Sequence, residues 1–95
     1  MHSTNQLKEL ADKGYADAQI KLGDCYYWGH GTEMDRAEAM IWYRKAADNG
    51  YADAQIKLGD CYYWGHGTEM NRTEAMIWYK KAADNGSKEA ENKLL

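Results

Sequence analysis

Ninety-five residues with a net charge of −3 allow at most one small domain and exclude several classes of function. Basic and acidic side chains are interspersed, so no basic stripe marks a nucleic-acid-binding surface. No apolar run approaches membrane-spanning length, and the N-terminus lacks the features of a signal peptide. We expect a chain that binds neither nucleic acid nor membrane and works in the cytoplasm; a mature secreted chain or an excised fragment is the alternative.

A 36-residue unit repeats along the chain. Residues 14–49 recur as residues 50–85 with three changes, Asp35 to Asn71, Ala37 to Thr73 and Arg44 to Lys80. The flanks are damaged copies of the same unit. The sequence therefore predicts one domain made of a half unit 1–13, a unit 14–49, a unit 50–85 and a half unit 86–95. Such near-identity indicates either a recent duplication or a deliberately built sequence.

The first helix of each unit is predicted over residues 16–28 and again over residues 52–64. Ala18, Leu22 and Tyr26 fall at helical spacing on one apolar stripe, and Cys25 is expected beside them as a buried apolar residue. Gly29 is expected to end this helix, because glycine accepts the left-handed conformation that a helix end needs.

The second helix is predicted over residues 36–48 and again over residues 72–84. Asp35 and Glu38 form a capping-box-like pair, in which each side chain satisfies a backbone N–H of the other residue. The copy keeps the pair as Asn71 and Glu74, and asparagine caps as well as aspartate. Gly50 then closes the helix. The predicted buried stripe consists of Ala39, Trp42, Tyr43 and Ala46, with small residues at Gly23, Ala46 and Ala47 for close helix approach.

A lone helix pair cannot bury such stripes, whereas stacked pairs can. The fold class expected is therefore all-α, an α-solenoid of antiparallel helix pairs. Two full units are fewer than the roughly three that stable arrays usually need. We thus expect another copy to cover the ends, by end-to-end stacking or by swapping of a terminal half unit, and a molecular mass that depends on concentration.

The run from Ala16 through Gly31, then Asp35, then Ala39 through Gly50 resembles the Sel-one-like repeat, a relative of the tetratricopeptide repeats. Thr32 departs from it, in a slot that is usually aliphatic. The resemblance implies a right-handed α-solenoid whose first helices line a concave face, and a role as adaptor or scaffold. A cysteine-rich secreted branch of the family bridges the two helices of each unit with a cysteine pair, and a single Cys per unit matches that branch poorly.

Alignment with the tetratricopeptide pattern assigns one stripe of the first helix to the concave side. The stripe combines acidic, apolar and aromatic groups, which suits an extended or helical peptide with basic and apolar side chains. The alternative is that Tyr27 and Trp28 pack against the neighbouring unit, since aromatic residues at helical spacing more often belong to the buried core. The candidate partner-binding residues are Asp17, Ile20, Asp24, Tyr27 and Trp28, with their copies Asp53, Ile56, Asp60, Tyr63 and Trp64.

Catalysis and metal binding are the weakest readings of the sequence. Cys25 and His30 could in principle act as nucleophile and base, but the cysteine is expected in the core and the histidine in a solvated Gly-flanked loop. The same two residues supply too few ligands for a structural zinc ion. We expect no enzyme activity, no cofactor and no metal. A minimal or engineered scaffold without a partner is the runner-up to a protein-binding module, and a small hydrolase or metal-binding protein is a distant third.

Overall fold

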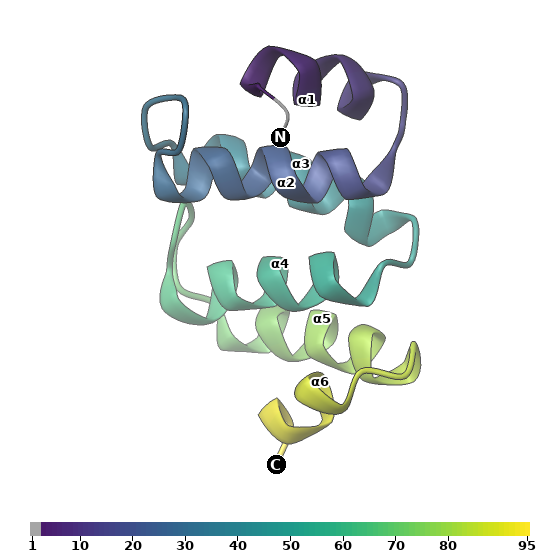
Figure 1. The fold of residues 1–95 in the computed structure, drawn as a ribbon. Coiled ribbons are helices and arrows are strands. Elements are labelled where there is room, and N and C mark those ends of the chain that lie inside the picture. The colour runs from purple at the N-terminus through teal and green to yellow at the C-terminus, as the bar shows by residue number, and fades with distance from the viewer. Residues whose placement is uncertain (1–2) are drawn as a thin grey trace.

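The computed structural model describes residues 3–95 and places every helix of that range in one antiparallel stack, with α1 at one end and α6 at the other (Figure 1). The predicted bounds of the four central helices are confirmed, and so is the α-solenoid architecture. The stack measures 38 × 25 × 18 Å. The helices are α1 Thr4–Asp12, α2 Ala16–Trp28, α3 Arg36–Asp48, α4 Ala52–Trp64, α5 Arg72–Asp84 and α6 Lys88–Lys93.

The helix ends follow the predicted capping residues, with one correction. Asp35 accepts a hydrogen bond from the backbone N–H of Glu38 at 3.0 Å, and Gly29 ends α2 in the left-handed conformation at φ 74°. The expectation of a reciprocal hydrogen bond, in which the Glu38 side chain accepts the backbone N–H of Asp35, was wrong. The Glu38 carboxylate instead accepts the indole N–H of Trp42 at 3.1 Å, one turn further along the same helix.

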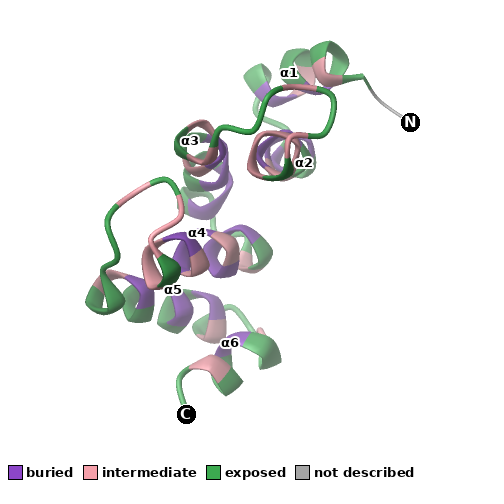
Figure 2. Cartoon of the chain, turned by 90° about the vertical axis from the view of Figure 1, so that its left-hand side faces the viewer, coloured by how far each residue is buried: buried purple, intermediate pink, exposed green. Residues whose placement is uncertain are grey.

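The core runs between successive helices of the stack, and each of its clusters joins residues of neighbouring units (Figure 2). Leu22 is fully buried, and Trp42 and Tyr43 are 5% and 2% exposed, which confirms their predicted packing role. A Cβ atom on Gly23 would lie 2.6 Å from the Tyr43 ring, so only glycine lets α2 and α3 approach this closely. Tyr26, predicted in the core, is half-buried, because it packs at the margin of two core clusters.

Two buried glutamines connect successive units. The side-chain N–H₂ of Gln19 donates to the Ala11 carbonyl at 3.1 Å, and Gln55 bonds the Ala47 carbonyl in the same way. Each bond adds a second donor to a carbonyl near the C-terminal end of the preceding helix, since the Ala11 and Ala47 carbonyls also accept the backbone N–H groups of Gly14 and Gly50 at 3.0 Å. The first helix of a unit is thereby held to the second helix of the unit before it.

The prediction of a buried cysteine holds for one copy only. Cys61 is completely buried, whereas Cys25 is half-buried; both thiols are free. The two residues differ because α1, which packs on α2, has 9 residues, whereas α3, which packs on α4, has 13. By the repeat, Thr4 at the start of α1 corresponds to Met40 in the second turn of α3, so α1 begins about one turn later in the repeat than α3 does.

Candidate functional site

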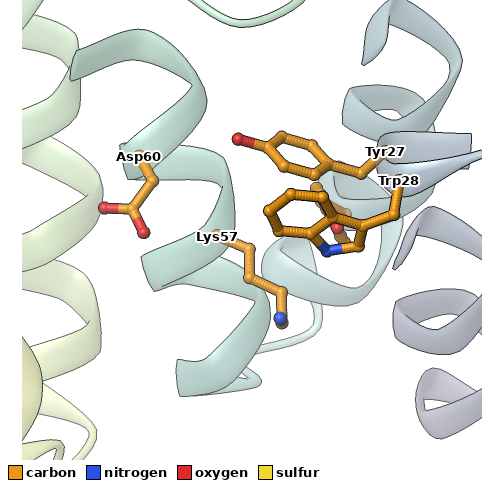
Figure 3. A pocket seen from close by; sticks show the side chains of 5 residues that line it. Tyr27, Trp28, Lys57 and Asp60 are labelled. Carbon is orange, nitrogen blue, oxygen red and sulfur yellow. The ribbon is translucent and has the colours of Figure 1, made fainter. Parts of the chain in front are cut away.

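An aromatic pocket opens between α2 and α4 (Figure 3). Its volume is about 120 Å³. Trp28 remains 58% exposed and packs edge-to-face on Tyr27, with the ring centroids 4.8 Å apart. The lining residues are Tyr27, Trp28, Tyr43, Lys57 and Asp60, and we call this the Trp28 pocket.

Polar contacts made by Asp24, which we call the polar frame, link consecutive units beside the Trp28 pocket. Asp24 accepts the Tyr43 hydroxyl at 2.6 Å and pairs with the Lys57 ammonium at 3.3 Å. Burial, and after it the hydrogen bond to Asp24, raises the pKa of Tyr43 well above its ordinary value, so the phenol stays protonated. The predicted site residue Asp24 therefore acts within the fold, by holding a buried phenol and the lysine of the next unit.

The Tyr27 side chain is held from two directions. Its hydroxyl hydrogen-bonds Nδ1 of His66, and the Arg36 guanidinium lies over its ring at 4.4 Å from the centroid. Burial raises the pKa of Tyr27 above its ordinary value. The sequence treats His30 and His66 alike, yet His30 is exposed, as predicted, and His66 contacts Tyr27. The partner of His66 comes from the preceding unit, so no local signal separates the two histidines.

A second pocket of the same construction lies one unit further on. Trp64 is 59% exposed and packs edge-to-face on Tyr63 at 4.7 Å between centroids, and Arg72 covers Tyr63 at 4.4 Å. Asp60 repeats the frame, since it accepts the Tyr79 hydroxyl at 2.5 Å and pairs with Lys93 at 3.3 Å. The lining residues are Tyr63, Trp64, Met76, Tyr79, Lys93 and Leu95, and we call this the Trp64 pocket.

Two of the acidic candidates, Asp17 and Asp53, line other pockets than the tryptophans do. Asp53 lines a pocket between α4 and α6 together with Ile56, Lys57, Asp60 and Glu89, the acidic pocket. Asp17 lies in a further pocket between α1 and α2, beside Lys21. The ten candidate residues thus share one series of helices but not one pocket, and Glu89 and Lys57 are lining residues that the sequence reading did not include. Glu89 is the repeat counterpart of Asp53, which was the available signal.

The two isoleucines of the predicted stripe do not behave alike. Ile20 is half-buried and packs against the core, whereas Ile56 is 4% exposed within a cluster that includes Ala82 and Ala90. Ile56 therefore lines the acidic pocket with only a small part of its surface, because Ala90 of α6 belongs to the same cluster.

The chemistry around Cys61 is that of a buried thiol. Burial, and next the charge of Asp60, raises the pKa of Cys61 to about 12, which disfavours the thiolate that a nucleophile or metal ligand needs. Within residues 3–95, no group of three or more His, Cys, Asp or Glu side chains is placed to hold a metal ion. Over the same residues, no helix has the length and apolar character needed to cross a bilayer.

Comparisons with known proteins connect this architecture to a family. The family model described as Sel1 repeat matches residues 16–51 and again residues 52–87. Over 41 residues, or 43% of this chain, the sequence is 46% identical to the secretory immunoglobulin A-binding protein EsiB of Escherichia coli O6:H1 and covers 8% of it.

Solved structures agree with this match. A Sel1 repeat protein from Oxalobacter formigenes is 37% identical at a TM-score of 0.90, over 96% of this chain and 37% of that protein. A protective antigen of uropathogenic Escherichia coli is 41% identical at a TM-score of 0.95, over 99% and 20%. The Helicobacter pylori cysteine rich protein B is 27% identical at a TM-score of 0.90, over 96% and 68%.

This chain therefore spans a small part of the curated relative and between a fifth and about two thirds of these structures. Two adjoining matches to one model cover most of the chain, and the stacked helix pairs agree with them. The chain belongs to the Sel1 repeat family.

Proposed function

We propose that this chain is a non-enzymatic protein-interaction module that binds a peptide or protein segment on its first-helix face, the side of α2, α4 and α6 where the pockets open. Sel1 repeats typically mediate protein–protein interaction, and one relative is named for binding secretory immunoglobulin A. The observation that carries the proposal is the repeated pocket. In each copy the tryptophan, Trp28 or Trp64, is more than half exposed and packs on a tyrosine ring that is itself held in place.

A held but exposed tryptophan suits binding for a physical reason. Tryptophan and tyrosine dominate binding hot spots, because a large ring buries much apolar area for little lost conformational freedom. The contacts of Tyr27 with Trp28, Arg36 and His66 further limit motion before any partner arrives. These contacts also support part of the alternative reading, since Tyr27 does pack against the next unit, while Trp28 leaves most of its surface free.

A displayed library of random twelve-residue peptides tests the proposal. The wild-type chain is expected to enrich peptides whose binding is lost in Trp28→Ala and Trp64→Ala variants. Ile41→Ala and Ile77→Ala are matched controls, because these side chains are 50% and 46% exposed on the second helices and line none of the pockets described above. Binding should survive in both controls.

Two outcomes would contradict the proposal. Peptides that bind the tryptophan variants as well as the wild type would move the interaction to another face. A folded chain that enriches no peptide would favour the alternative of a scaffold without a partner of its own, for which the near-identity of the two units is the specific observation.

A further inference from the structure

The Trp28 pocket and the acidic pocket adjoin each other across α4. Lys57 and Asp60 line both pockets, so the two hollows adjoin on the same helix. Figure 3 shows the Trp28 end, where the rings of Tyr27 and Trp28 reach from α2 toward Lys57. The other end lies between Asp53 of α4 and Glu89 of α6. We call this path, from Trp28 to Glu89, the α4 groove.

The charges within the α4 groove are unevenly compensated. Lys57 pairs with Asp24 at 3.3 Å, and Asp60 pairs with Lys93 at 3.3 Å. Asp53 and Glu89 are both exposed, and within residues 3–95 neither takes part in an ion pair shorter than 4.0 Å. The groove is therefore apolar and aromatic at one end and carries two uncompensated negative charges at the other.

We propose that the α4 groove selects an extended peptide that carries an aromatic or large aliphatic side chain and, about three residues away, a lysine or arginine. This rests on the proposed function and names the chemistry of its partner. The apolar side chain packs on Trp28, and the cation lies between Asp53 and Glu89. The two pockets flank α4, with a lateral spacing of about 8–10 Å. Asp53 also precedes Lys57, the nearest lining residue of the Trp28 pocket, by four residues of α4, which adds an offset of about 6 Å along the helix. An extended chain rises about 3.3 Å per residue and covers the combined distance of about 10–12 Å in about three residues.

The Trp64 pocket provides an internal contrast. Its aromatic residues repeat those of the Trp28 pocket, but its lining contains Lys93 and no acidic side chain. It therefore offers the apolar contact without the attraction for a cation. Selection for a basic residue should accordingly depend on Trp28 and not on Trp64, although the two tryptophans occupy the same position of the repeat.

The same random twelve-residue library tests the inference against charge variants of the full chain. Peptides enriched by the wild type are expected to pair an apolar residue with a lysine or arginine about three positions away. The double variant Asp53→Lys, Glu89→Lys should bind these peptides about tenfold more weakly and enrich acidic residues at that position. The neutral pair Asp53→Asn, Glu89→Gln should lose the basic preference without gaining an acidic one.

The matched control is Asp12→Lys with Asp84→Lys. It makes the same change of net charge at exposed acids at the ends of α1 and α5 that line none of the pockets described above. This control should keep the wild-type peptide preference, and melting curves by circular dichroism confirm that each variant is folded.

Three outcomes separate the inference from the proposed function. A preference for basic residues that is lost when Asp53 and Glu89, or Trp28, are replaced supports both the inference and the proposed function. Peptides that need the tryptophans but show no basic preference, or show one that the control also abolishes, overturn the inference alone. A folded wild-type chain that enriches nothing overturns both.

Discussion

Trp42 and Trp78 occupy the same position of successive units, yet their indole N–H groups meet different surroundings. The Trp42 N–H donates to Glu38 at 3.1 Å, whereas the Trp78 N–H is buried and finds no hydrogen-bond partner among residues 3–95. An unsatisfied buried donor costs about 1–3 kcal/mol, while a satisfied one is nearly neutral or favourable. A position in a repeat thus fixes the residue type but not its contribution to stability.

Substitution of the two tryptophans should reveal this difference. Trp42→Ala and Trp78→Ala are each expected to lower the free energy of unfolding by about 3–5 kcal/mol, because each opens a cavity in the core. Trp42→Phe should cost about 1 kcal/mol more than Trp78→Phe, since only the first loses a hydrogen bond. Urea denaturation measures all four values. A small loss of unfolding free energy in the alanine variants would contradict the packing role. Equal losses in the two phenylalanine variants would contradict the hydrogen-bond argument.

The two cysteines should differ in reactivity. Cys25 is half-buried and Cys61 fully buried, and burial raises the pKa of both thiols, that of Cys61 to about 12. A water-soluble thiol reagent at pH 8 should therefore label Cys25 in the folded chain and label Cys61 only after unfolding. Mass spectrometry of the digested protein assigns the label. Equal labelling of both thiols in the folded chain would contradict the burial of Cys61.

The same thiol links stability to pH. A folded-state pKa above the ordinary value of 9.0 means that the unfolded chain loses its proton first as pH rises. The stabilisation by the neutral thiol is complete below about pH 9 and disappears between about pH 9 and pH 12. Tyr43 and Tyr79, whose pKa values are also raised, act in the same direction above their ordinary value of 10.0.

At the scale of elements, the loop between α4 and α5 lies against the start of α3. A Cβ atom on Gly67 would come 2.5 Å from the Arg36 carbonyl oxygen. Its counterpart Gly31 would place a Cβ 2.7 Å from the Thr4 hydroxyl, which is the end of a side chain that can turn away. Both glycines have positive φ, at 84° and 76°, so alanine is strained at either position.

The two glycines are therefore a matched pair for testing the contact between units. Gly31→Ala should cost about 1–2 kcal/mol through backbone strain alone. Gly67→Ala should cost about 1–3 kcal/mol more, because the added carbon meets rigid backbone at the start of α3. Thermal or urea unfolding gives both values. Equal losses would show that the loop and α3 are not packed this closely.

At the scale of the whole molecule, the two ends of the stack differ in polarity. Leu94 corresponds by the repeat to Leu22 and Leu58, which are fully buried, but it is 39% exposed. Leu95 next to it is fully exposed. At the other end Gln6, at the position of Trp42, belongs to the capping box that starts α1. The α6 end therefore leaves apolar surface uncovered, whereas the α1 end carries polar groups.

The exposed apolar end leads to a prediction about self-association. We expect the molecular mass to rise with concentration in sedimentation experiments, because α6 leaves a core position uncovered. Leu94→Gln should reduce the association, and Ile41→Ala, at a similarly exposed apolar site on α3, should leave it unchanged. A strictly monomeric mass across a wide dilution series would contradict the prediction.

The sequence by itself determined the architecture of this protein. A repeat of 36 residues, apolar stripes at helical spacing, and capping residues such as Asp35 and Gly29 are local signals, and each helix of the two full units begins and ends where they indicate. Gly23 and Tyr43 could also be assigned to a close helix contact, because residue size limits how near two helices come. The same spacing left open whether Trp28 and Trp64 are exposed or packed against the neighbouring unit.

Only the tertiary structure decided what identical residues do in successive units. His66 meets Tyr27 while His30 meets solvent, Cys61 is buried while Cys25 is half-buried, and Ile56 is covered by α6. In a stack each unit is completed by its neighbours, and the neighbours differ at the two ends of this chain. The α4 groove arises in the same way, because its lining comes from four helices, α2, α3, α4 and α6, whose contacts no single repeat encodes.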